Sequence, residues 1–231
     1  MNYKLVIIIL LSVGLICLQI MWGIMYLHHP ALNNVYDLLE LIKVGVGYSN
    51  PMLHATILGW IYIIILNWIY ERHHTYYILR MSRNRYYKVL ISSAAIWNIV
   101  FSVIYLLGQE INIMKCNVSF LFNAVFWKRE IIFFLAIIMI HSLNSAVFTM
   151  NYVLFHKNAI LISCVMITAI YVLGLYWPDI FFVYNDIYVV DSSKTMLAKI
   201  VVLMRNACLS GIIYVVMLGV FKKRDLLDCE K

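Results

Sequence analysis

Long apolar runs separated by short polar connections dominate the chain. Each run is about 20 residues long, which is the length that an α-helix needs to cross the hydrocarbon core of a bilayer. Backbone groups in lipid must be hydrogen-bonded within the segment, so the runs predict helices; they are too long and too uniformly apolar for the strands of a membrane barrel. The six expected spans are residues 5–26, 52–70, 89–107, 131–152, 159–176 and 200–221.

The first apolar run raises the question of a cleaved signal peptide, because Lys4 precedes it. Its stretch of about 20 apolar residues is longer than the apolar region of a signal peptide. No small-x-small cleavage pattern follows it. We therefore expect residues 5–26 to remain as the first membrane span.

The composition supports a membrane protein and bears on its orientation. The 231 residues are 64% hydrophobic and 13% charged, whereas soluble domains carry about 25% charged residues. The net charge of +7 is spread through the connections, so orientation in the membrane explains it better than binding of nucleic acid. Six spans place both termini on one side, and that side holds 11 of the 18 basic residues. This bias predicts that both termini are cytoplasmic.

The whole chain, residues 1–231, is expected to form a single all-α transmembrane domain. Its connections reach about 25 residues, well short of a soluble domain. The connection before the last span is rich in aromatic residues and carries Asp179, Asp186 and Asp191. Tyr and Trp favour the membrane interface, so this connection should lie in the outer interface or re-enter the membrane. The richness in Ile, Asn, Lys and Tyr is typical of an AT-rich bacterial genome, which predicts a bacterial cytoplasmic membrane.

The sequence offers little for catalysis. The five cysteines form no CxxC pair, which argues against a metal site and a disulfide framework. No Gly-rich loop ending in Lys-Ser or Lys-Thr occurs, so the chain is not expected to bind a nucleotide itself. We therefore expect no catalytic residue, no metal and no cofactor on this chain.

Polar residues interrupt the fourth apolar run on one helix face. His141, Ser145 and Thr149 recur at every fourth position. Polar groups at this depth can line a substrate pathway, or they can hydrogen-bond one helix to another, which is the more common role of Ser and Thr. A metal or protease site at His141 would need a set of further His or carboxylate ligands from other spans, and we expect no such site.

Arg205 lies in the first part of the last run. It precedes Lys222 by 17 residues, about 25 Å at helical rise, which places it near the outer edge of the membrane. Its long side chain can snorkel to the interface. The alternative is a charge that lines a substrate pathway, paired with Glu110 or Asp191.

The connection between the second and third runs carries a dense group of charges. Glu71 comes where the second span leaves the membrane, residues 75–81 can form about two helical turns, and Ser82 can cap the next helix. Positive charges in the first turns of that helix, such as Arg83, oppose its dipole. We therefore expect these charges to serve orientation, lipid phosphates or a protein partner.

The order of these features resembles the permease subunits of ABC-2-type transporters. In that family a Glu follows the second span, a short interfacial coupling helix comes next, and a Ser-Arg pair leads into the third span. Glu71, residues 75–81 and the pair Ser82-Arg83 match this order, and "GVFKKRDLL" near the end of the chain is similar to the basic tail of that family.

The chain also departs from the family pattern. His73 and His74 stand where the family has a small residue, and Met81 stands where it usually has proline. These departures affect the register of the coupling helix.

The resemblance implies the membrane half of an ATP-driven exporter, similar to the permeases of bacterial peptide-antibiotic export and self-immunity systems. Separate ABC-type ATPase subunits would handle ATP and Mg²⁺, and a second permease subunit, identical or related, would complete the pathway. The alternative is a non-transporting accessory or sensor protein of an antimicrobial-peptide system. The residues implied in ATPase docking are Glu71, Arg72, Thr75, Tyr77, Ile78, Arg80, Ser82 and Arg83.

Overall fold

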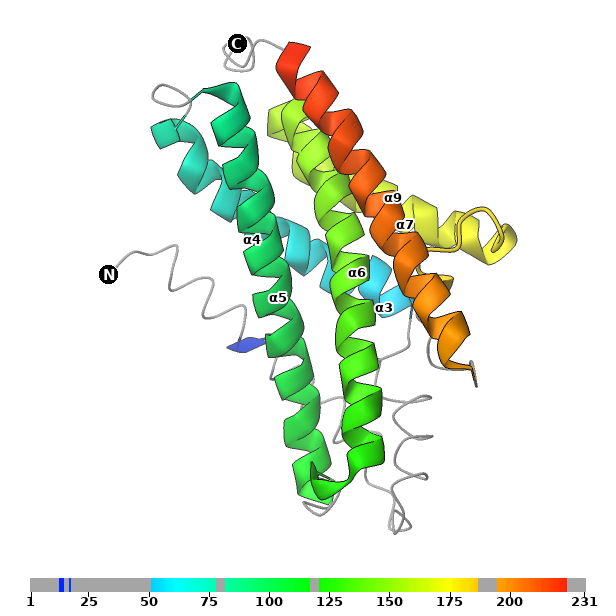
Figure 1. The fold of residues 1–231 in the computed structure, drawn as a ribbon. Helices are drawn as coiled ribbons and strands as arrows, with labels where there is room; N and C mark the ends of the chain where they lie inside the picture. The colour runs from blue at the N-terminus through cyan, green and yellow to red at the C-terminus, as the bar shows by residue number, and fades with distance from the viewer. Residues whose placement is uncertain are drawn as a thin grey trace.

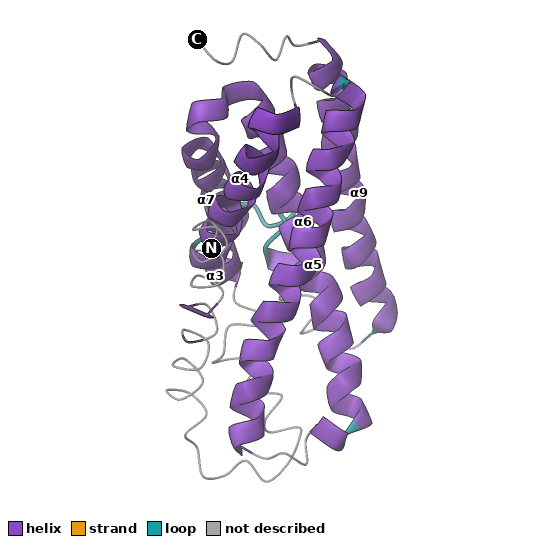
Figure 2. Ribbon diagram, turned by 90° about the vertical axis from the view of Figure 1, so that its left-hand side faces the viewer, coloured by secondary structure: helices purple, strands orange, loops and turns teal. Residues whose placement is uncertain are grey.

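The computed structural model describes residues 13, 14, 17, 51–77, 82–116, 121–186 and 195–223. Helices joined by turns make up this part of the chain, with no strand among the described residues (Figure 2). The expected all-helical class is thus confirmed. The elements are α3 (Pro51–Ala55), α4 (Ile57–Tyr77), α5 (Arg83–Cys116), α6 (Ala124–Phe155), the 3-10 helix η2 (His156–Asn158), α7 (Ala159–Tyr176) and α9 (Met196–Lys223).

Helix α6 is the centre of the bundle. It packs against α4, α5, α7 and α9 (Figure 1). From Ile140 to Val153 nearly all of its side chains are buried. A helix that is apolar on all sides is stable only when it is surrounded, which explains why the fourth apolar run of the sequence takes this position.

Four segments are long and apolar enough to cross a membrane by length and composition: Pro51–Glu71, Asn84–Gly108, Ala124–Tyr176 and Met196–Phe221. The third contains both α6 and α7, which pack against each other and are joined by η2. These segments support a membrane protein. The expected first span, residues 5–26, lies outside the described residues apart from 13, 14 and 17, so six spans and their orientation stay predictions.

Large apolar side chains cover the outside of the bundle. Soluble monomers rarely expose so many large apolar side chains, because their contact with water is unfavourable. Contact with lipid in place of water removes this cost. Exposed examples on α5, α7 and α9 include Ile96, Leu161, Val165, Leu197, Ile212 and Val215.

Helix α4 differs from the sequence prediction at its end. It continues without a break to Tyr77, so residues 75–77 belong to α4 and do not begin a separate coupling helix. No glycine or proline interrupts the chain between Trp60 and Tyr77, and the Asn67 side chain donates a hydrogen bond of 2.9 Å to Glu71 one turn later. The rest of the expected coupling helix, residues 78–81, lies outside the described residues.

Helices α5 and α6 are longer than their apolar runs. They contain 34 and 32 residues, or about 51 and 48 Å at helical rise, against about 30 Å for the apolar layer of a bilayer. The two helices lie side by side (Figure 1). The end of α5 at Cys116 and the start of α6 at Ala124 extend past α3. We call this end of the bundle the hairpin end.

The opposite end gathers the end of α4, the start of α5 and the end of α9. Tyr86 and Tyr87 in the first turns of α5 are buried, and their ring centroids lie 5.9 and 5.4 Å from that of Phe221 on α9. The Tyr87 hydroxyl also donates to the Tyr214 carbonyl. We call this end the α4–α5 end; it corresponds to the side that the sequence predicts to be cytoplasmic.

Candidate functional site

The segment that follows α7, residues 177–186, folds back against the bundle. Its backbone makes turns, with hydrogen bonds from Phe181 N to Trp177 O at 3.0 Å and from Asp186 N to Phe182 O at 2.8 Å. The side chains of Val183, Tyr184 and Asp186 are buried. We call residues 177–186 the anchored segment. The sequence predicts an interfacial or re-entrant segment here; residues 187–194 lie outside the described residues.

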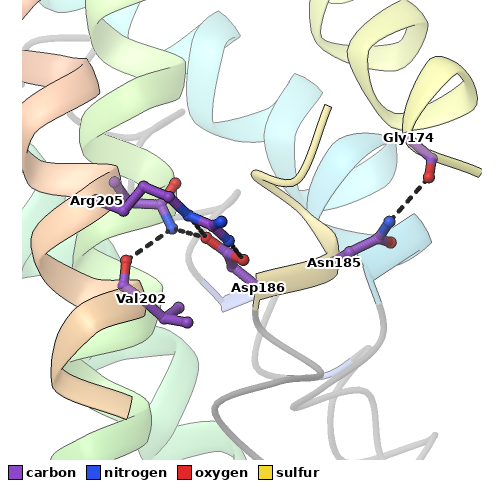
Figure 3. Close-up of polar contacts among 6 residues, drawn as sticks. Gly174, Asn185, Asp186, Val202 and Arg205 are labelled. Atoms are coloured by element: carbon purple, nitrogen blue, oxygen red, sulfur yellow. Dashed lines mark hydrogen bonds and ion pairs between the residues drawn. The ribbon is translucent and has the colours of Figure 1, made fainter. Parts of the chain in front are cut away.

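Three consecutive side chains tie the anchored segment to three different helices. The Tyr184 hydroxyl donates a hydrogen bond of 2.6 Å to the Asn144 amide oxygen on α6. Asn185 Nδ2 donates to the Gly174 carbonyl on α7 at 2.9 Å, and Asp186 forms an ion pair with Arg205 on α9 (Figure 3). These bonds hold the segment in one place between α6, α7 and α9.

The Asp186–Arg205 pair has one buried and one accessible partner. Asp186 is 3% exposed, whereas the Arg205 side chain is 42% exposed. Arg205 contacts both carboxylate oxygens, with Nε 3.3 Å from Oδ2, and its Cζ lies 3.6 Å from the Phe182 ring centroid. Asn206 Nδ2 donates a further hydrogen bond of 2.7 Å to Oδ2. Burial raises the pKa of Asp186, while the bonds from Arg205 and Asn206 oppose that shift.

This geometry answers the question that the sequence leaves open about Arg205. Its partner is Asp186, whereas the sequence-based alternatives were Glu110 and Asp191. Glu110 lies on α5 and its carboxyl interacts with Glu130, and Asp191 lies outside the described residues. The sequence contains three aspartates in this connection and no local signal that selects among them, so the choice depends on how residues 177–186 fold.

The polar residues of α6 lie inside the bundle. Ser145 Oγ is 2.7 Å from the Tyr214 hydroxyl on α9, and Thr149 Oγ1 is 2.6 Å from the Tyr70 hydroxyl on α4. Both side chains therefore connect helices, which is the packing role considered for them at the sequence level. A role of Ser145 and Thr149 in lining a pathway stays a prediction.

His141 lies in a group of aromatic rings. Its ring centroid is 4.7 Å from that of Tyr62, 4.8 Å from that of Phe101 and 5.7 Å from that of His54. The side chain is fully buried, and among the described residues neither ring nitrogen has a hydrogen-bond partner. No group of three or more His, Cys, Asp or Glu side chains that could hold a metal ion occurs in the described part of the chain.

The residues predicted to dock an ATPase are only partly described. Glu71 is exposed in the last turns of α4 and accepts the hydrogen bond from Asn67. Ser82 directly precedes α5, and its carbonyl accepts hydrogen bonds from the backbone of Arg85 and Tyr86 at 2.9 and 3.0 Å. The remaining predicted docking residues have no described side chains: Arg72, Thr75, Tyr77, Ile78, Arg80 and Arg83.

Comparison of the chain with models of protein families, with curated proteins and with solved structures found no match.

Proposed function

We propose that this chain is the membrane-spanning permease subunit of an ATP-driven exporter of the ABC type, with a peptide antibiotic or a similar amphipathic molecule as its cargo. Separate ATPase subunits dock at the α4–α5 end, and a second permease subunit completes the pathway. The observation that carries the proposal is the order of groups at this end: the Glu71 carboxylate, bonded to Asn67, in the last turns of α4, and Ser82 and Arg83 where α5 begins.

The position of Glu71 supports a docking role. The Asn67 hydrogen bond of 2.9 Å restricts the carboxylate, and the side chain remains exposed. Arg85, Lys88 and Lys157 are exposed on the neighbouring first turns of α5 and on η2. A surface that presents one fixed acid among several bases suits a protein partner with complementary charges.

Helix α9 offers a mechanical connection between the ATPase side and the opposite side of the bundle. At the α4–α5 end, Phe221 packs against Tyr86 and Tyr87 at the start of α5. Arg205 lies 16 residues earlier on the same helix, about 24 Å away at helical rise, and holds the anchored segment through Asp186. A displacement of the start of α5 would thus be transmitted along α9 to the anchored segment.

The test is purification of the tagged chain from its native host in mild detergent, with the accompanying proteins identified by mass spectrometry. We expect an ATPase with Walker motifs in stoichiometric amounts. Glu71→Gln should release this ATPase, because it removes the charge and keeps the shape of the side chain. Asp179→Asn is the matched control: Asp179 is also exposed but follows α7 at the other side, where an ATPase would not bind.

Two results would contradict the proposal. If the wild-type chain brings down no ATPase under conditions that preserve its fold, the accessory or sensor role becomes the better explanation. If the ATPase stays bound to Glu71→Gln and its hydrolysis is still stimulated, the docking role of this end fails.

A further inference from the structure

A cavity of about 280 Å³ lies between α5 and α6 towards the hairpin end. Two acidic side chains line it, Glu110 from α5 and Glu130 from α6. The rest of the wall is apolar and consists of Val103, Leu106, Leu107, Trp127, Ile131 and Phe134. Two acidic residues thus form part of the wall of an otherwise apolar cavity.

The Glu110 carboxyl has an unused hydrogen-bond acceptor beside this cavity. The residue is 8% exposed, and its Oε2 atom has no hydrogen-bond partner among the described residues. A hydrogen bond connects this carboxyl to the Glu130 side chain. Because a hydrogen bond between two carboxyl groups needs a proton, the bonded pair carries about one negative charge. A buried acceptor without a donor is costly, so the site favours a ligand that brings one.

The cavity lies at the boundary of the apolar layer. The membrane-length segment of α5 ends at Gly108, two residues before Glu110. Val103 and Leu107 lie within this segment, so the apolar wall reaches into the layer while Glu110 lies just outside it. Amphipathic molecules that lie in the membrane interface are found at this depth.

We propose that this cavity binds an alkylammonium group of a cationic amphipathic peptide. The ammonium donates hydrogen bonds to Glu110 Oε2 and to Glu130, and the alkyl stem lies along the apolar wall. One ammonium matches the single negative charge of the carboxyl pair, and the volume suits one lysine-sized chain. A zwitterionic lipid would bring its phosphate next to the carboxyl pair, where like charges repel. The inference names the cargo class of the proposed function and rests on it for that role.

The protonation of the pair gives the binding a pH dependence. Burial raises the pKa of Glu110 to about 7, and the hydrogen bond to Glu130 opposes the shift. The other charged groups nearby on α6 are Lys128, which is exposed, and Arg129, whose Cζ lies 5.2 Å from the Phe133 ring centroid. Loss of the shared proton at higher pH gives the pair a second negative charge that attracts the ammonium, so binding should strengthen as the pH rises through about 7.

The test measures saturable binding of a fluorescently labelled amphipathic Leu-Lys peptide to the protein in phosphatidylcholine nanodiscs at mildly alkaline pH, with empty discs subtracted. Glu110→Gln and Glu130→Gln should each weaken binding about 10-fold to 100-fold, which corresponds to a charge-assisted hydrogen bond. Asp179→Asn, which neutralises an exposed carboxylate near α7, should bind like the wild type. The same peptide with acetylated lysines should bind weakly to the wild type, and this arm does not depend on the folding of any variant.

Three outcomes would overturn the inference. Wild-type affinity in both glutamine variants would show that the carboxyl pair takes no part. Equal binding of the acetylated peptide would remove the need for an ammonium, and loss of peptide binding in discs that contain phosphatidylethanolamine would identify a lipid head group as the occupant. Because the discs contain no ATPase, these outcomes are separate from the ATPase copurification that tests the proposed function.

Discussion

The Asp186–Arg205 pair predicts an asymmetry between its two single variants. Arg205→Met keeps an unbranched stem of similar length. It leaves the Asp186 carboxylate, which is 3% exposed, with Asn206 as its remaining side-chain donor among the described residues. Breaking a buried pair in this way costs about 3 to 5 kcal/mol, and we expect a value near the lower limit, about 3 kcal/mol, because the Asn206 bond remains.

Asp186→Asn removes the charge from the buried partner instead. Arg205 is 42% exposed, so its guanidinium can turn towards water or lipid head groups. The interaction that is lost is therefore that of a half-exposed ion pair, and its removal should lower the free energy of unfolding by about 1 kcal/mol. The double variant Asp186→Asn with Arg205→Met should be more stable than Arg205→Met alone, because no buried charge remains.

Thermal denaturation of the purified protein in detergent, followed by tryptophan fluorescence, measures this difference. For a chain of this size about 1 kcal/mol corresponds to roughly 2 to 4 °C, so Arg205→Met should lose about three times as much in Tm as Asp186→Asn. Burial raises the pKa of Asp186, and without Arg205 the rise is larger. The folded state then binds the proton more tightly than the unfolded state, so the stability of Arg205→Met should fall as the pH rises above about 4, the ordinary Asp pKa. An equal or larger loss in Asp186→Asn, or a pH-independent Tm in Arg205→Met, would refute this reasoning.

Three further predictions follow from other contacts. Gly174→Ala should displace the anchored segment, because a Cβ there would lie 2.6 Å from the Phe181 carbonyl oxygen; proteolysis of the segment should accelerate, while Gly211→Ala, with no atom within 4 Å of its Cβ, should behave like the wild type. Glu110→Gln should flatten the pH dependence of stability. Because the pKa of Glu110 is raised from 4.5 to about 7, the wild type should lose at most about 3 kcal/mol of its free energy of unfolding as the pH rises across that range. A Tm profile in the variant that is unchanged from the wild type would contradict this. Tyr70→Phe should cost about 1 kcal/mol by removing the hydrogen bond to Thr149, whereas a loss as large as that of Arg205→Met would mean that the hydroxyl does more than join α4 to α6.

The helices were predictable because their signal is local. An apolar run of about 20 residues predicts a membrane helix from its length alone. The runs at 89–107, 131–152, 159–176 and 200–221 fall within described helices, and the run at 52–70 is divided between α3 and α4 at Thr56. Helix ends were predicted less well. Once backbone hydrogen bonds are formed, a helix continues into polar sequence until a residue stops it, so α5 begins at Arg83 and ends at Cys116, and α4 continues to Tyr77.

The pairing of polar side chains needed the tertiary structure. The sequence contains Arg205 and three aspartates in the preceding connection. Only the folding of residues 177–186 against α6, α7 and α9 brings Asp186 to Arg205. Glu110 and Glu130 belong to different apolar runs, and the packing of α5 on α6 places both in one cavity. The sequence by itself determined that the chain is helical and apolar enough for a membrane, since those properties depend on neighbours along the chain. Which charges and hydroxyls meet was decided by helix packing, because their energies depend on distances between residues far apart in sequence.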